Sequence, residues 1–191
     1  MHKYQTAFLT GQRLYLRPVE KEDAHYIKKW ANDPQIRRLT AEVTPMTQAA
    51  FDAFLTKVHQ DPDRVWFMVV LRENDRVIGE AGLLRMFPPW RTTDLSIILG
   101  EPDAWGQGYG TEAIRLLLDY AFGHLNFHRV ALGVVGFNER AIHFYESMGF
   151  KKEGIERDGY YYDHAYHDFI MMSILEEEYR QHYANKPNPR S

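Results

Sequence analysis

A glycine-rich segment near the middle of the chain restricts the possible folds more than any other feature. Residues 105–111 read Trp-Gly-Gln-Gly-Tyr-Gly-Thr and follow a short apolar segment, Leu95–Leu99. The next residues, Thr111–Phe122, carry apolar side chains at helical spacing, namely Ile114, Leu117, Leu118 and Ala121. Glycine allows a sharp turn and a close approach of the backbone to a ligand. The pattern therefore predicts a strand, a tight loop and an amphipathic helix in succession, which is typical of an α/β chain.

The same loop predicts an anion site, because the first amides of a helix lack intrahelical partners and the helix dipole is positive there. A pyrophosphate or another polyphosphate is the ligand class that fits. Gly110 is followed by Thr111-Glu112, whereas a P-loop needs Lys and then Ser or Thr. A dinucleotide loop has G-x-G-x-x-G spacing and an acid after the next strand, but residues 134–137 supply none. Dinucleotide binding is disfavoured, and an NAD(P)-dependent oxidoreductase stays as an alternative function.

Strand and helix patterns alternate along the chain in the order β-α-α-β-β-β-α-β-α-β-β-α. The predicted strands are Arg13–Pro18, Val65–Glu73, Arg76–Leu84, Leu95–Leu99, Arg129–Val135, Lys151–Arg157 and Asp168–Ser173. The predicted helices are Glu20–Asn32, a helix from the N-cap Thr47 through Val58, Thr111–Phe122, one from the N-cap Asn138 to Met148, and Leu175–Tyr183. This order predicts an α/β (α+β) fold with a mixed sheet and helices on both faces. We expect a single domain over residues 1–184 and a loose tail over 185–191.

Composition excludes several classes of protein. The chain has 23 Lys and Arg against 26 Asp and Glu, a net charge of −3, which argues against nucleic acid as a partner. It has no Cys, so a cysteine nucleophile and thiolate-bound metals are excluded. The His and Asp residues within 163–168 lack a recognised ligand spacing, and we expect no metal. Apolar runs fall far short of the ~20 residues of a membrane span, and no signal peptide is evident, so we expect a cytoplasmic protein without a membrane partner.

Further motifs accompany the glycine loop. Residues 138–145 read Asn-Glu-Arg-Ala-Ile-His-Phe-Tyr, and residues 148–150 read Met-Gly-Phe. Near the start, Leu16-Arg17-Pro18 precedes Glu22-Asp23-Ala24. Together these motifs resemble the GNAT superfamily of acetyl-CoA-dependent N-acetyltransferases, and the end of the chain is similar to the ribosomal-protein and spermidine acetyltransferase branches. The resemblance spans about Leu14 to Tyr183 and implies a splayed, mixed β-sheet.

The resemblance implies a role for each part of the site. Acetyl-CoA would be the co-substrate, and its pyrophosphate would be held by backbone amides of Gln107, Gly108, Tyr109, Gly110 and Thr111. The pantetheine arm would lie beside one strand as a neighbouring strand does, at Ile97, Ile98 and Leu99. Asn138 would face the cofactor from the other side of a V-shaped gap between parallel strands. Tyr145 would be the general acid that protonates the departing CoA thiolate. Trp105 stands where the superfamily often has Gln or Arg.

Acetyl transfer to an amine needs a neutral amine, a polarised thioester carbonyl and a proton for the leaving thiolate. An amine with a pKa of ~10.4 is almost entirely charged at pH 7, so a general base is useful. Two carboxylates are candidates for that base, first Asp94 at the start of one predicted strand and second Glu80 on its neighbour. A strand amide near Ile98 or Leu99 could polarise the carbonyl, as an oxyanion hole does. Tyr145 also has the i, i+3 and i, i+4 spacing of an ordinary core residue.

Without Cys, direct transfer in a ternary complex is the simplest route. The acceptor is expected to be a primary amine, and a protein N-terminus, a polyamine and an antibiotic amine all stay open. Two loops, Thr40–Met46 and Arg85–Thr93, are expected to build the acceptor pocket, because loops carry most specificity. A non-catalytic CoA-binding regulator of the same fold is a further alternative. A homodimer is the default expectation for the oligomeric state.

Overall fold

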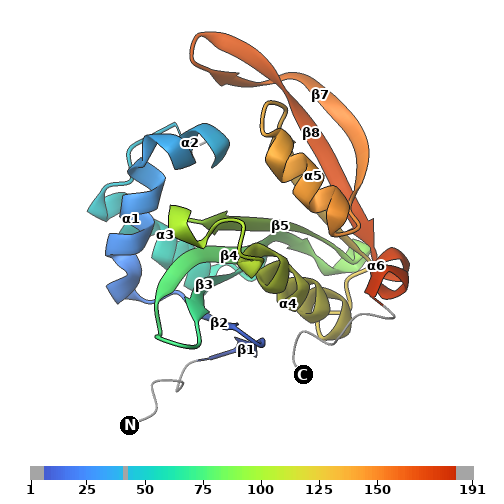
Figure 1. Cartoon of the computed structure of the whole chain (residues 1–191), viewed down its shortest axis with the longest axis horizontal. Helices are drawn as coiled ribbons and strands as arrows, with labels where there is room; N and C mark the ends of the chain where they lie inside the picture. Colours follow the sequence, from blue (N-terminus) through green and yellow to red (C-terminus); the bar gives the residue numbers. More distant parts are fainter. Residues whose placement is uncertain (1–6, 41–42, 184–191) are drawn as a thin grey trace.

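The computed structural model describes residues 7–40 and 43–183, so the predicted tail lies outside the described residues. One eight-stranded sheet runs in the order β1-β2-β3-β4-β5-β6-β8-β7 (Figure 1). Its strands are β1 (Leu9–Thr10), β2 (Leu14–Pro18), β3 (Val65–Leu71), β4 (Val77–Phe87), β5 (Thr92–Leu99), β6 (Arg129–Val135), β7 (Lys151–Tyr162) and β8 (Ala165–Leu175). Neighbouring strands are antiparallel except for β5 and β6, which are parallel. The predicted mixed sheet is confirmed.

Helices cover both faces of this sheet (Figure 1). They are α1 (Ala24–Asn32), α2 (Pro34–Thr40), α3 (Gln48–Gln60), α4 (Tyr109–Gly123), α5 (Glu139–Ser147) and α6 (Glu176–Tyr183). The first three helices pack on one face, in an apolar cluster that includes Trp30, Ile36 and Phe51. The other face is covered by α4 and α5, in a larger cluster that includes Leu117 and Tyr145. Within residues 7–40 and 43–183, no helix combines the length and the apolar character that crossing a membrane requires.

Two helices begin at the caps that the sequence predicts. Thr47 Oγ1 accepts a hydrogen bond from the Ala50 amide at 3.1 Å, and Asn138 Oδ1 accepts one from the Ala141 amide at 3.2 Å. Each cap satisfies a first-turn amide that has no intrahelical partner. At the other end of α5, Gly149 has a φ of +96°, the left-handed conformation that ends many helices.

The helix α2 is absent from the sequence prediction. Pro34 follows the predicted helix Glu20–Asn32 and occupies the first turn of α2, where its missing amide hydrogen costs nothing. Asp33 acts as the cap, because its Oδ1 accepts hydrogen bonds from the amides of Gln35 at 2.8 Å and Ile36 at 3.2 Å. The Asn-Asp-Pro sequence therefore ends one helix and begins another.

The predicted strands Lys151–Arg157 and Asp168–Ser173 are too short. They belong to a long antiparallel hairpin, β7–β8, which projects beyond the rest of the sheet (Figure 1). A register shift between Glu156 and Tyr160 interrupts the period-2 pattern, and this bulge explains why the sequence pattern ends early. The short strand β1 was not predicted either, because two residues carry no periodic signal.

The sheet splits between β5 and β6. The two strands pair over three residues only, Thr92–Asp94 of β5 against Arg129–Ala131 of β6. Beyond this point β5 stays paired with β4 as far as Leu99, whereas β6 stays paired with β8. The two halves of the sheet therefore diverge, and the V-shaped gap implied by the resemblance is present.

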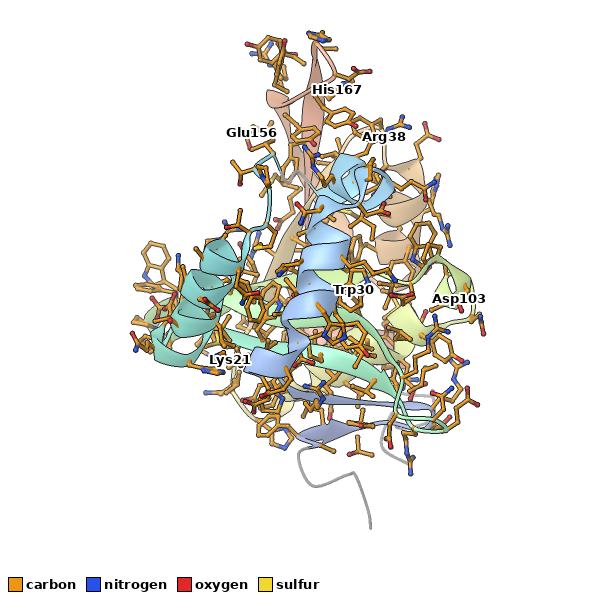
Figure 2. The ribbon with its side chains drawn as sticks, turned by 90° about the vertical axis from the view of Figure 1, so that its left-hand side faces the viewer. Lys21, Trp30, Arg38, Asp103, Glu156 and His167 are labelled. Carbon is orange, nitrogen blue, oxygen red and sulfur yellow. The ribbon has the colours of Figure 1, made fainter. Side chains whose placement is uncertain are left out.

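Trp30 fixes α1 against the end of β5. Its indole is fully buried and its Nε1 donates a hydrogen bond to Glu101 Oε1 at 2.9 Å; Figure 2 labels this residue on the helix. The ring lies over the backbone of Gly100, where an added Cβ would come within 2.1 Å of an indole carbon. Gly100 is thus required by the close approach of an aromatic ring rather than by a turn.

We expect Gly100→Ala to lower the stability of the fold, because the new methyl group overlaps the buried indole. Overpacking of this kind costs about 1–3 kcal/mol, which corresponds to a clear fall in Tm. Thermal unfolding followed by circular dichroism measures it. Gly154→Ala is the control, since a Cβ there has no neighbouring atom within 4 Å. Equal Tm values for the two variants would contradict the packing described here.

Candidate active site

A cavity of about 800 Å³ lies at the split in the sheet, and elements from both faces line it. Its lining comes from two groups of elements. One group is the strand β5 with the glycine loop and α5; the lining residues include Ile97, Ile98, Leu99, Gly108, Tyr109, Gly110, Thr111, Asn138 and Tyr145. The other group is α1, α2, α3, β3 and β4; the lining residues include Ile27, Ala31, Ile36, Leu39, Met46, Phe54, Trp66 and Glu80. Most of the predicted site residues are therefore brought together at one place.

The glycine loop turns sharply into α4. Gly106 and Gly108 have φ values of +74° and +82°, a conformation that side-chain-bearing residues rarely adopt. Gly108 is the N-cap of α4, so the first-turn amides of a fifteen-residue helix face the loop. This backbone fits a pyrophosphate, because these amides have no intrahelical acceptor and the positive end of the dipole lies there.

Glu112 and Arg13 fix the loop to the sheet. The Glu112 carboxylate accepts hydrogen bonds from the Arg13 amide at 2.8 Å, from Arg13 Nε at 3.1 Å and from the Leu14 amide at 3.3 Å. The same arginine donates from Nη1 to the Gln107 carbonyl at 2.9 Å. The start of α4 is thereby tied to the start of β2, which leaves the loop little freedom to move when a ligand binds.

Two of the side chains in the loop serve its conformation. Trp105 Nε1 donates a hydrogen bond to the Leu99 carbonyl at 2.7 Å, so this indole joins the loop to the end of β5. Gln107 donates to the Asp103 carbonyl and does not line the cavity, unlike the other predicted loop residues. The predicted contact of Gln107 with the pyrophosphate can therefore be made only by its backbone amide.

One edge of β5 faces the cavity along Ile97, Ile98 and Leu99. On the opposite edge these residues pair with Ala81, Glu80 and Gly79 of β4. An unpaired strand edge presents amide and carbonyl groups that need partners. The pantetheine arm carries amides of its own, so the exposed edge suits the strand-like pairing that the resemblance implies.

Arg140 also lines the cavity, on the first turn of α5, and the sequence analysis assigned it no role. Its guanidinium lies 5.6 Å from the centre of the Trp105 ring, next to Gly106. It is therefore a cationic group close to the predicted pyrophosphate site. The position of Arg140, two residues after the helix cap Asn138, could be read from the sequence. Charged residues are common at exposed helix starts, however, so this position alone did not indicate a binding role.

Tyr145 is buried, with 9% of its surface exposed, and it lines the cavity from α5. Its ring packs against Phe144 and Phe150, so the core spacing noted in the sequence is also real. Burial raises the pKa of the Tyr145 phenol to about 12, because the charged phenolate is poorly solvated there. The phenol is therefore held in its protonated form, as a proton donor must be.

The two candidate bases have different surroundings. Glu80 is 6% exposed, lines the cavity and accepts a hydrogen bond from Trp66 Nε1 at 2.7 Å. Asp94 does not line the cavity, and its carboxylate is held in an ion pair by Arg85. The order of preference from the sequence, Asp94 before Glu80, is thus opposite to what the geometry favours. Asp94 sits where β5 still pairs with β6, before the gap opens.

The two predicted acceptor loops also differ. Thr40 and Met46 line the cavity, as expected for the segment Thr40–Met46. The residues of the segment Arg85–Thr93 do not, and the indole of Trp90 is 76% exposed. This segment extends β4 to Phe87 and then forms a short 3-10 turn, Pro88–Trp90. Its two prolines therefore stiffen the end of the β4–β5 hairpin rather than the pocket.

Phe137, between β6 and α5, contacts both α2 and the β7–β8 hairpin. Arg38 lies 5.3 Å from the centre of the Phe137 ring, and Phe137 packs on His167 at 4.9 Å. Figure 2 shows Arg38 and His167 at the same end of the molecule. The two halves of the molecule therefore meet again at this end, and the cavity lies between this contact and the paired part of β5 and β6.

Comparison with known proteins agrees with this geometry. The model of the acetyltransferase (GNAT) domain matches residues 13–151. An uncharacterized N-acetyltransferase p20 of Bacillus licheniformis is 30% identical over 90% of this chain and 97% of its own. Spermidine N(1)-acetyltransferase of Escherichia coli is 28% identical over 86% of this chain and 87% of its own. A crystal structure of spermidine N-acetyltransferase from Vibrio cholerae in complex with CoA and spermine matches with a TM-score of 0.82 and 28% identity, over 87% of this chain and 98% of that one.

These matches span the glycine loop, the split sheet and both groups of elements that line the cavity. The alternative of an NAD(P)-dependent oxidoreductase is thereby set aside, and acetyl-CoA is the co-substrate that fits the loop. The chain belongs to the GNAT family and is an N-acetyltransferase that acts on an amine.

Proposed function

We propose that the chain transfers the acetyl group of acetyl-CoA directly to a primary amine, with Glu80 as the general base and Tyr145 as the general acid. One observation carries this assignment of roles: a single cavity joins the glycine loop and Tyr145 to Glu80 through the split in the sheet. A donor held on one side can then meet an acceptor that enters from the other. The absence of Cys supports a direct transfer, because no thiol can carry the acetyl group in between.

The proposed reaction moves one acetyl group and three protons, two of which leave the nitrogen and one of which reaches the sulfur. Glu80 takes a proton from the ammonium form of the acceptor, which leaves a nitrogen lone pair free to attack the thioester carbonyl. A C–N bond forms and the C–S bond breaks, while a β5 amide near Ile98 stabilises the negative charge on the carbonyl oxygen. Tyr145 gives its proton to the departing thiolate, and the acetylated nitrogen releases its second proton to solvent to become the neutral amide. Solvent then restores both residues to their starting protonation states.

The acceptors named for two relatives are polyamines, and a polyamine and a protein N-terminus are both primary amines that this reaction would accept. A homodimer and a cytoplasmic location remain proposals from the sequence. Size-exclusion chromatography with light scattering and cell fractionation would test them.

We expect Tyr145→Phe to lower kcat by about 10²-fold, because the variant lacks the proton that the thiolate needs, within the usual range for general acids. Its affinity for acetyl-CoA should stay within about twofold in calorimetry, since the ring still packs on Phe150. Tyr161→Phe is the control, because that ring is exposed on the hairpin. An unchanged kcat would remove Tyr145 from the mechanism.

The raised pKa of Tyr145 makes a separate prediction for pH dependence. Because burial raises this pKa to about 12, the phenol of the free enzyme stays protonated through pH 10 and loses its proton only above that. The ratio of wild-type to Tyr145→Phe activity should therefore be constant between about pH 7 and pH 10. A ratio that falls toward one near pH 10 would indicate an ordinary tyrosine pKa and contradict the burial argument.

We expect Glu80→Gln to lower kcat/KM by about 10²-fold at pH 7 and to lose the acidic limb of the pH–rate profile, since the amide cannot accept the proton. The amide can still receive the Trp66 hydrogen bond, so the fold should be kept. Asp94→Asn is the matched control and should leave the profile unmoved. If instead Asp94→Asn lowers kcat/KM and Glu80→Gln leaves it unchanged, the base is Asp94.

We expect Arg140→Ala to raise the Kd for acetyl-CoA by about tenfold, because a charge-assisted hydrogen bond to a phosphate contributes about 1.5–3 kcal/mol before solvent exposure weakens it. Isothermal titration calorimetry measures the change. Arg157→Ala is the control, since that exposed side chain on β7 lies outside the cavity lining. An unchanged Kd would mean that the backbone of the glycine loop suffices.

A further inference from the structure

We propose that the acceptor is a primary monoamine with an apolar body, such as an alkylamine or an arylalkylamine, rather than a polycation. This inference rests on the proposed function, because it takes Glu80 as the group that receives the reacting amine. The observation behind it is the chemistry of the cavity wall on the side of α1, α2 and α3. Among the residues that the structure describes, that wall is mostly apolar and aromatic, and Glu80 is its single carboxylate.

The apolar wall is made by side chains from four elements. They are Ile27 and Ala31 of α1, Ile36 and Leu39 of α2, Met46 and Phe54 before and within α3, and Trp66 of β3. Phe54 and Trp66 meet edge to face, with ring centres 6.1 Å apart. Burying an apolar group against such a wall is favourable by about 25 cal/mol per Å². A hydrocarbon chain or a ring attached to the reacting amine would gain this burial.

Trp66 is held in place at this wall, so the aromatic surface next to Glu80 is rigid. Its Nε1 donates to Glu80 Oε2 at 2.7 Å. Its ring lies on the backbone of Gly82, where an added Cβ would approach a ring carbon to 2.5 Å. An acceptor whose amine reaches Glu80 therefore lies next to the Trp66 indole.

The charges in the cavity do not suit a polycation. Among the described residues that line it, the ionisable groups other than tyrosine are one carboxylate, Glu80, and two guanidiniums, Arg64 and Arg140. Arg64 is paired with Asp61 at 3.0 Å, and Asp61 itself does not line the cavity. A polyamine brings at least two ammonium groups at pH 7, and Glu80 can compensate only one of them.

A second ammonium in this cavity would lose its hydration without gaining an anionic partner among the described lining residues. The desolvation penalty of an unpaired charge exceeds the attraction that Trp66 or Phe54 can offer through a cation–π contact. The nearby carboxylates of the hairpin are also outside the wall; Asp168, for example, accepts a hydrogen bond from the Asp158 amide at 3.2 Å. The cavity therefore selects an acceptor with one positive charge.

The experiment compares two amines of equal length, heptylamine and 1,6-diaminohexane, which differ by a methyl group in place of a second ammonium. CoA released by the full chain is detected with a thiol reagent, and the absence of Cys removes any protein background. Spermidine and 2-phenylethylamine extend the panel. We expect kcat/KM for heptylamine to exceed that for 1,6-diaminohexane by at least about tenfold, because only the diamine buries a second, unpaired charge.

A designed variant provides an independent readout. Leu39→Glu adds a carboxylate to the wall at a position that is already 37% exposed, so the fold should tolerate it. We expect the preference for heptylamine over the diamine to fall by about tenfold in this variant, since the second ammonium then has a partner. Gln35→Glu adds the same charge to the same helix outside the cavity lining, and it should keep the wild-type preference.

The outcomes separate the two proposals. A higher kcat/KM for 1,6-diaminohexane or spermidine than for the monoamines would overturn the inference and leave the proposed function intact. Loss of the preference in both Leu39→Glu and Gln35→Glu would also overturn the inference. The choice of amine would then depend on the overall electrostatic field of the protein rather than on the cavity wall. Release of CoA with none of the four amines, although calorimetry detects acetyl-CoA binding, would count against both the inference and the assignment of Glu80 and Tyr145.

Discussion

The divergence of two parallel strands is the constraint on which the rest of the structure depends. β5 and β6 pair over Thr92–Asp94 and then separate, because β5 follows β4 while β6 follows β8. The separation leaves one edge of β5 without a strand partner beyond Asp94 and makes room for the cavity between the two halves of the sheet. The cavity, the exposed strand edge and the meeting of donor and acceptor sides all follow from this one departure from regular pairing.

Polar contacts at the ends of the strands hold the two walls of the split in position. Trp105 joins the glycine loop to the Leu99 carbonyl, and Glu112 joins the start of α4 to β2. On the other face, Trp30 packs against Gly100 and donates a hydrogen bond to Glu101. The site is therefore built from rigid elements that were fixed for packing reasons, so that the amides and carboxylates of the site need little reorganisation when substrates bind.

The chemistry of the site follows from unequal environments for its polar groups. Tyr145 is surrounded by aromatic rings, and burial keeps its phenol protonated. Glu80 lies across the split, next to an indole N–H. The proposed acid and the proposed base thus line the same cavity in unlike environments.

The sequence by itself determined the local units and much of the site. The caps Thr47 and Asn138, the left-handed glycines of the loop and the apolar stripes follow from short-range geometry, so they could be predicted. Local rules failed where two signals share the same residues, as in Asn32-Asp33-Pro34, which both ends α1 and caps α2. They failed again in the hairpin, where a bulge interrupts the alternation on which strand prediction depends.

Only the tertiary structure decided which carboxylate reaches the cavity and which charges lie around the acceptor. Asp94 and Glu80 are both strand residues in the sequence, but the point at which β5 leaves β6 puts Glu80 at the cavity and leaves Asp94 paired with Arg85. The apolar wall is assembled from α1, α2, α3 and β3, segments whose spacing along the chain carries no sign of their proximity. The physical reason is that local patterns report what one element prefers, whereas the opening of a sheet depends on how all its strands compete for partners.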